Sequence, residues 1–150
     1  MIRRYVLFAL LALGIWVAPA IVRADTGCDS VYAQDLARQG YRYLDAHRWQ
    51  DARMAAGQLA LYARGCSDPK VGYPSVVHSA YIGSAALHGL GENDKAAKTV
   101  QMGMVVLQAL KNEGGFASLY DAMEPKFSEL AHEVAPVAAS AAPVPASPAP

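Results

Sequence analysis

The positions of the two cysteines constrain the fold more than any other feature of the chain. Cys28 and Cys66 each lie 19 residues from His47, within the stretch DAHRW, whose composition indicates a turn. If residues 29–46 and 49–65 form antiparallel helices joined at this turn, equal helix lengths bring both cysteines to the same open end of the hairpin. A disulfide there would close the hairpin and stabilise it by about 3 to 4 kcal/mol in the chain-entropy model.

The rest of the chain favours helices. Ala, Leu, Gln, Arg and Met dominate, and no stretch has the sustained alternation of β-branched residues that a sheet requires. We therefore predict an all-α fold of two antiparallel helix-turn-helix hairpins followed by a C-terminal capping helix. The expected helices span residues 29–46, 49–64, 75–91, 93–112 and 116–133.

Capping residues and helix breakers set these boundaries. Asp29, or the serine after it, is expected to cap the first helix, and Gly65 to end the second in a left-handed conformation. The stretch SDPKVGYP, residues 67–74, is dense in turn-forming residues and predicts a loop. Ser75 is then expected to cap the third helix.

The fourth and fifth helical regions have distinctive patterns. TVQMGMVVLQAL places twelve uncharged residues between Lys98 and Lys111. This run is too short for a membrane span and predicts the most enclosed helix of a bundle, with Met102 and Met104 filling its core. In the last region, Pro125 predicts a kink or a restart of the helix.

The N-terminal segment has the features of a secretory signal. Two arginines precede an uncharged run of 18 residues, and small residues flank the arginine of VRA, residues 22–24. We expect cleavage after Ala24, with Ala20 as a second option, and a periplasmic or secreted protein. The alternative is an N-terminal membrane anchor, because 18 apolar residues are just long enough to span hydrocarbon.

The chain thus divides into a signal peptide, residues 1–24, a helical domain, residues 25–133, and a tail, residues 134–150. The tail contains only Val, Ala, Pro and Ser and holds five of the nine prolines, so we expect it to be disordered. Removal of the signal takes away three arginines and leaves 10 basic and 13 acidic side chains, a net charge of −3. This mildly acidic chain without basic runs argues against nucleic acid as the partner.

Export makes a disulfide the default state of Cys28 and Cys66. Zinc would need two further ligands, but the four histidines lack metal-ligand spacing and neither CxxC nor HExxH occurs. A redox-active pair usually has closely spaced thiols. We therefore expect a structural disulfide, no metal and no cofactor.

An internal similarity connects the two expected hairpins. The stretch GYRYLDAHRWQDARMAAGQL aligns with SAALHGLGENDKAAKTVQMG, 44 residues later. Gly40 falls on Ser84 and Ala52 on Ala96, so small residues meet at both positions. This pattern resembles the tetratricopeptide repeat, a helix-turn-helix unit in which small residues of the two helices pack together and an aromatic residue often lies in the turn. The resemblance covers about two units, over residues 30–110.

The pattern departs from this family in three respects. The 44-residue offset exceeds the usual repeat of about 34 residues, and we expect the surplus in a loop from Cys66 to Pro74. A large apolar residue commonly precedes the small one in the first helix, but Gln39 and Gly83 occupy that position. The proline that usually closes a unit is missing from both units. So short an array also needs a cap, which residues 116–133 would provide.

The resemblance implies a concave, partner-binding surface formed mostly by the first helix of each hairpin. By position, this surface would hold Gln34, Tyr41, Leu44 and Asp45 from the first hairpin and His78, Tyr81 and His88 from the second. Aromatic rings beside hydrogen-bonding groups suit a protein or peptide partner. Such side chains also commonly pack at their base and reach water at their tips, which is the ordinary structural role.

The expected function is therefore an exported scaffold that binds a protein or peptide. The motifs GxSxG and HExxH are absent, and both cysteines are assigned to the disulfide, so we expect no enzyme. The acidic residues of the last helical region stand where solvated helix faces need charge. The alternative is a structural protein of the cell envelope that associates into homo-oligomers.

Overall fold

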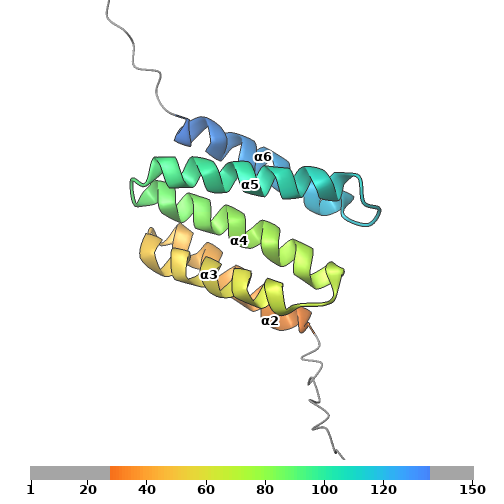
Figure 1. Cartoon of the computed structure of the whole chain (residues 1–150). Coiled ribbons are helices and arrows are strands. Elements are labelled where there is room, and N and C mark those ends of the chain that lie inside the picture. Colours follow the sequence, from red (N-terminus) through yellow and green to blue (C-terminus); the bar gives the residue numbers. More distant parts are fainter. Residues whose placement is uncertain (1–27, 136–150) are drawn as a thin grey trace, which may run out of the picture.

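The computed structural model describes residues 28–135, which form five helices and contain no strand. The helices are α2 (Ser30–Asp45), α3 (Trp49–Gly65), α4 (Pro69–Gly89), α5 (Asn93–Lys111) and α6 (Ala117–Val134). They lie alongside one another, with α2 and α3 at one end, α4 and α5 between, and α6 at the other end (Figure 1). The all-α prediction is confirmed. The expected signal peptide, the membrane-anchor alternative and residues 136–150 of the expected tail lie outside the described residues.

Adjacent helices form the two predicted hairpins, α2–α3 and α4–α5, and α6 follows them. Helix α4 contacts each of the other four helices. Helix α6 packs on α5 and α4, so it covers the second hairpin as the predicted cap. Among the helices of residues 28–135, none is both long and apolar enough to span a membrane.

The two hairpin turns share one backbone hydrogen-bond pattern, 44 residues apart. In the first turn, the His47 N–H donates to the Leu44 carbonyl at 2.9 Å and the Arg48 N–H donates to the Tyr43 carbonyl at 2.8 Å. In the second turn, the Gly91 N–H donates to the His88 carbonyl at 2.8 Å and the Glu92 N–H donates to the Leu87 carbonyl at 2.9 Å. His47 and Gly91 both have positive φ, at 54° and 76°. The helix ends Asp45 and Gly89 also differ by 44 residues. The internal similarity of the sequence therefore corresponds to two turns of the same geometry.

Two clusters of buried side chains share α4. The first joins α2, α3 and α4 and contains Leu59 and Ile82, which are fully buried. The second joins α4, α5 and α6 around Leu107 and Phe127. Because α4 contributes to both clusters, the two hairpins and α6 are connected through buried apolar contacts.

Gly40 lies at a crossing of α2 with α4, which the sequence did not predict. A Cβ atom at Gly40 would stand 2.8 Å from Cδ1 of Ile82 on α4. The sequence predicted a crossing with Ala52 of α3 instead. Ala52 is fully buried in the same cluster. Gly40 therefore allows α2 and α4, one helix from each hairpin, to approach each other.

Most of residues 67–74, predicted to be a loop, is helical. Asp68 caps α4, and its carboxylate accepts a backbone N–H of the first turn at 2.9 Å. Pro69 suits the first helical position because its missing N–H would have no partner within the helix. Pro74 follows inside the helix, and Ser75 donates to a backbone carbonyl one turn earlier, at 2.7 Å, instead of capping. The extra residues that make the offset 44 therefore lie partly within helix α4, which has 21 residues where α2 has 16.

Two predicted helix ends also differ. Gly65 is the last residue of α3 and is not among the glycines with positive φ, because the chain leaves the helix through an extended Cys66. Helix α6 continues through Pro125, whose side chain is exposed, so water can reach the carbonyl that loses its donor. Val134, assigned to the tail from the sequence, is the buried last residue of α6.

Helix α5 is not the most enclosed helix. Met102 is 62% exposed and Val105 is 66% exposed, whereas Met104 is half-buried against the second cluster. Only Met104 therefore has the predicted core-filling role. The enclosed position belongs to α4, since it alone contacts all four of the other described helices.

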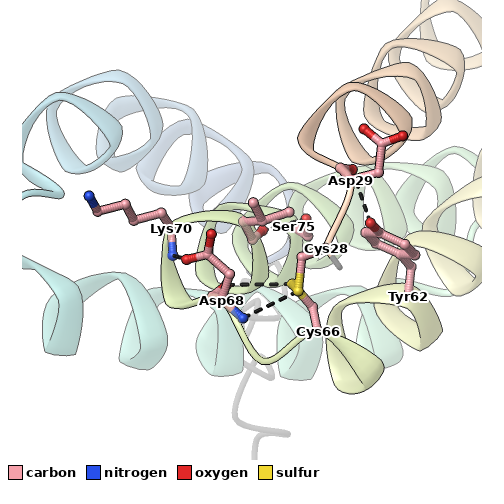
Figure 2. Close-up of a disulfide and its surroundings, with 8 residues drawn as sticks. Cys28, Asp29, Tyr62, Cys66, Asp68, Lys70 and Ser75 are labelled. Atoms are coloured by element: carbon pink, nitrogen blue, oxygen red, sulfur yellow. Dashed lines mark hydrogen bonds between the residues drawn. A yellow bond between two sulfur atoms is a disulfide. The ribbon is translucent and has the colours of Figure 1, made fainter. Parts of the chain in front are cut away.

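Cys28 and Cys66 form the predicted disulfide at the open end of the first hairpin, with their Cα atoms 5.2 Å apart (Figure 2). Next to it, the Tyr62 hydroxyl donates to the Asp29 carbonyl at 3.0 Å. The Asp68 N–H donates to Sγ of Cys28 at 3.2 Å. The bridge thus holds together the start of α2, the end of α3 and the cap of α4. Asp29 caps α2, as predicted.

Candidate functional site

A groove of about 510 Å³ lies between α2 and the N-terminal half of α4. Small and apolar side chains line much of it, and Arg38 and Lys70 contribute positive charge. Three of the residues predicted to contact a partner, Gln34, Tyr41 and His78, line this groove. We call it the first pocket.

Helical periodicity produces the two walls of the first pocket. On α2 the lining residues recur every three or four positions, from Ser30 to Tyr41. On α4 they recur in the same way from Lys70 to His78. Such spacing places side chains on one face of each helix, and the small side chain of Ala37 leaves room between the two faces.

Tyr41 and His78 connect the two walls. The Tyr41 hydroxyl and Nδ1 of His78 lie 2.9 Å apart in a hydrogen bond, and their rings meet edge to face at 5.8 Å. Burial raises the pKa of Tyr41, and the neighbouring Tyr81 raises it further. Burial lowers the pKa of His78, and the positive charge of Lys126 adds to this effect. The environment therefore favours the neutral forms of both hydrogen-bonded side chains.

Lys126 of α6 joins this cluster, which sequence reasoning missed because α6 was expected only as a cap. The Tyr41 and Tyr81 ring centroids are 6.0 Å apart. The Lys126 ammonium lies 5.3 Å from the Tyr41 centroid and 5.8 Å from the Tyr81 centroid. The Tyr41 hydroxyl also lies 3.9 Å from Sδ of Met123. Side chains of α2, α4 and α6 therefore meet on one face of the molecule.

A second pocket of about 400 Å³ lies between α4, α6 and the turn of the first hairpin. The turn and the first residue of α3 supply His47 and Trp49, whose rings meet edge to face at 4.9 Å. The indole packs on Gly89, where a Cβ atom would come within 2.3 Å of the ring. The remaining polar and aromatic lining residues are Tyr81, His88, Lys126, Glu129 and Glu133.

His88 stands between two neighbours at the edge of the second pocket. Its Nδ1 atom forms a hydrogen bond with Oδ1 of Asn93 at 2.8 Å. Its Nε2 atom lies 3.7 Å from Oε2 of Glu133 on α6. Glu129 and Glu133 follow Lys126 by three and seven residues. This helical spacing is the sequence signal that could have placed the three charges on one face of α6.

The residues predicted from the sequence are divided between the two pockets. Gln34, Tyr41 and His78 belong to the first pocket, whereas Tyr81 and His88 belong to the second. The pockets meet where the Tyr41 and Tyr81 rings adjoin. Asp45 is exposed and lines neither pocket, and Leu44 packs against the first buried cluster.

Within residues 28–135, no group of three or more His, Cys, Asp or Glu side chains is placed to hold a metal ion. Comparison of the chain with protein families, curated proteins and solved structures finds no match. The function is therefore inferred from the geometry of the two pockets.

Proposed function

We propose that this protein is an exported helical-repeat scaffold of the tetratricopeptide type, periplasmic or secreted, that binds an extended segment of a protein partner and has no catalytic role. The observation that carries this proposal is a single stripe along α4. Residues 71, 74, 75, 78, 81, 85 and 88 follow one another at helical spacing and line the first and then the second pocket. Helix α2 forms the wall beside the first pocket, and α6 forms the wall beside the second.

The length of the stripe suits a short peptide. From Lys70 to His88 the helix rises about 27 Å. An extended chain of about eight residues covers the same distance. The stripe offers apolar surface at the half-buried Pro74 for a side chain of the peptide. On the facing wall, the exposed amide of Gln34 can both donate to and accept from the peptide backbone.

Two features support export and the repeat assignment. A formed disulfide suits an oxidising compartment outside the cytoplasm. The recurrence of one turn geometry after 44 residues suits a repeated helix-turn-helix unit. Mass spectrometry of the protein recovered from the cell envelope or medium should give a chain that begins at Asp25 and is two hydrogens lighter than the dithiol. A chain that retains residues 1–24 would support the membrane-anchor alternative instead.

Selection from a library of eight-residue peptides, followed by titration of the winners, tests the binding function. Gln34→Trp places a large ring in the first pocket and should weaken binding about tenfold or more, which corresponds to about 1.4 kcal/mol. Gln58→Trp is the matched control because Gln58 is also exposed but lies on α3, outside both pockets. Equal effects of the two variants, or no selected peptide, would contradict the proposal.

A second candidate function, self-association, is favoured by one observation. An apolar groove of about 410 Å³ follows α5 and α6, and Met102 and Val105 expose large apolar side chains on α5. A second copy of the chain could cover this face. Sedimentation equilibrium should then show a dimer that Val105→Glu converts to a monomer. A monomer at all concentrations would exclude this candidate.

A further inference from the structure

The two pockets differ in charge. The lining of the first pocket contains Arg38 and Lys70 but no carboxylate. The lining of the second contains two carboxylates, Glu129 and Glu133, against one ammonium, Lys126, together with the aromatic rings of Trp49 and Tyr81. A peptide that follows α4 would therefore pass from a cationic end to an end with two carboxylates.

Lys126 lines the second pocket, and its ammonium lies on the side of that pocket next to the first. Its ammonium lies within 6 Å of the ring centroids of Tyr41 and Tyr81, the two rings at which the pockets meet. Glu129 and Glu133 lie further along α6, one helical turn apart on the same face. Tyr81 is affected by both carboxylates, because its pKa is raised first by burial and then by Glu129 and Glu133.

The arrangement of His88 and Glu133 provides acceptors for a donor from a ligand. The side-chain oxygen of Asn93 can only accept, so the 2.8 Å bond assigns the proton of a neutral His88 ring to Nδ1. Nε2 is then an acceptor, and it faces the carboxylate Oε2 of Glu133 at 3.7 Å. A ligand N–H group beside the line that joins these atoms, about 2.9 Å from each, can donate to both in a bifurcated hydrogen bond.

The aromatic walls favour the same class of ligand. Cations are attracted to the faces of Trp and Tyr rings, and more strongly where the site is shielded from water. A guanidinium group can in addition stack on a ring and donate to a carboxylate through a planar pair of N–H groups. Trp49, Tyr81 and the two glutamates therefore offer complementary contacts to a basic side chain.

We propose that the second pocket is a subsite for one basic side chain of the bound peptide, preferably arginine, with Glu129 and Glu133 as its anionic partners and Trp49 and Tyr81 as its aromatic walls. The identification of the occupant as a peptide side chain rests on the proposed function. The subsite also gives the peptide a direction. Ser75 and Ala85, which represent the two pockets on α4, are about 15 Å apart, so the basic residue stands about four to five residues from the segment in the first pocket.

Tryptophan fluorescence tests the subsite directly. The sequence has two tryptophans, so in the full chain with Trp16→Phe, fluorescence reports only on Trp49 at the pocket. N-acetylarginine amide should change this fluorescence in a saturable way. N-acetylcitrulline amide has nearly the same shape without the charge and should bind at least about tenfold more weakly.

Charge-neutralising variants complete the test. The double variant Glu129→Gln, Glu133→Gln should lower the affinity for arginine amide about tenfold or more. Glu124→Gln is the matched control, since Glu124 is on α6 but outside both pockets, and it should change nothing. Equal responses to arginine and citrulline amides, or an unchanged affinity in the double variant, would overturn the subsite.

The same measurements separate this inference from the proposed function. Selected peptides that bind in the first pocket without any basic residue would sustain the scaffold and overturn the subsite. Binding of arginine amide at Trp49 with no peptide selected at all would overturn the peptide as occupant and the scaffold with it, while the cation pocket itself would stand.

Discussion

The turn of the first hairpin places His47 at φ 54°, at the position where the turn of the second hairpin places Gly91 at φ 76°. Glycine adopts this conformation readily, whereas a residue with a Cβ atom pays about 1 to 2 kcal/mol. The first hairpin also carries the disulfide, and the second has no covalent closure because the chain contains only two cysteines. The first hairpin therefore combines a less favourable turn with a constraint at its opposite end, while the second relies on a favourable turn and on α6.

Among the changes that test this comparison, removal of the disulfide should lower the free energy of unfolding the most. The bridge closes a loop with a sequence separation of 38 residues, and replacing both cysteines with serine should lower the free energy of unfolding by about 4 kcal/mol. Urea denaturation measures this difference, and the reduced wild-type protein provides the matched control. If the double variant were as stable as the oxidised protein, the first hairpin would need no covalent constraint.

Gly40→Leu should have the next largest effect, a loss of about 1 to 3 kcal/mol from overpacking. The new side chain would meet Ile82 of α4, so it should separate the hairpins and leave the first hairpin intact. Combining Gly40→Leu with Ile82→Ala should cost less than the sum of the two single changes, as measured in a double-mutant cycle by thermal denaturation. Additive losses would place the crossing elsewhere.

Exchange of the turn residues tests the comparison itself. His47→Gly should stabilise the protein by about 1 kcal/mol, because it relieves the positive φ. Gly91→His should destabilise it by a similar amount for the converse reason. Chemical denaturation of both variants gives the two signs, and effects of the same sign would show that contacts of the His47 side chain, such as that with Trp49, outweigh backbone strain.

The smallest expected effect concerns pH. His78 occupies the position in the second hairpin that Gln34 occupies in the first, 44 residues earlier. Because the pKa of His78 is lowered from 6.5 in the folded protein, the unfolded chain takes up the proton first. The free energy of unfolding should therefore fall as pH decreases below about 6.5 and through the folded pKa. His78→Gln should reduce this dependence in melting curves from pH 7.5 to pH 5, and an unchanged slope would contradict the assignment.

Features governed by short-range chemistry could be predicted from the sequence. The cap at Asp29, the turn at His47 and the pairing of the cysteines depend on a few neighbouring residues and on helix length, and the structure confirms them. The start of α4 could not be predicted in the same way. Pro69 and Pro74 are loop-forming by composition, yet they lie in the first turns of a helix that Asp68 caps.

Candidate partner-binding residues could be predicted only on the helices for which the repeat resemblance supplied a packing partner. Tyr41, His78 and Tyr81 were placed on a common surface through the resemblance of the hairpins, and they do adjoin. Lys126 and Glu133 were not placed on this surface, because their positions depend on how α6 packs against α4. Nothing in the local sequence sets that packing. The division into two pockets follows from the same long-range packing.

The central position of α4 has a consequence for how the molecule opens. Every other described helix contacts α4, so the α4 helix cannot come apart without disrupting both buried clusters. Its amide protons should therefore exchange with solvent only through global unfolding, whereas the outer turns of α2 and α6 can fray locally. The surface proposed to receive a peptide thus lies on the helix expected to exchange most slowly. A bound peptide should add protection to the walls that α2 and α6 supply and leave α4 nearly unchanged.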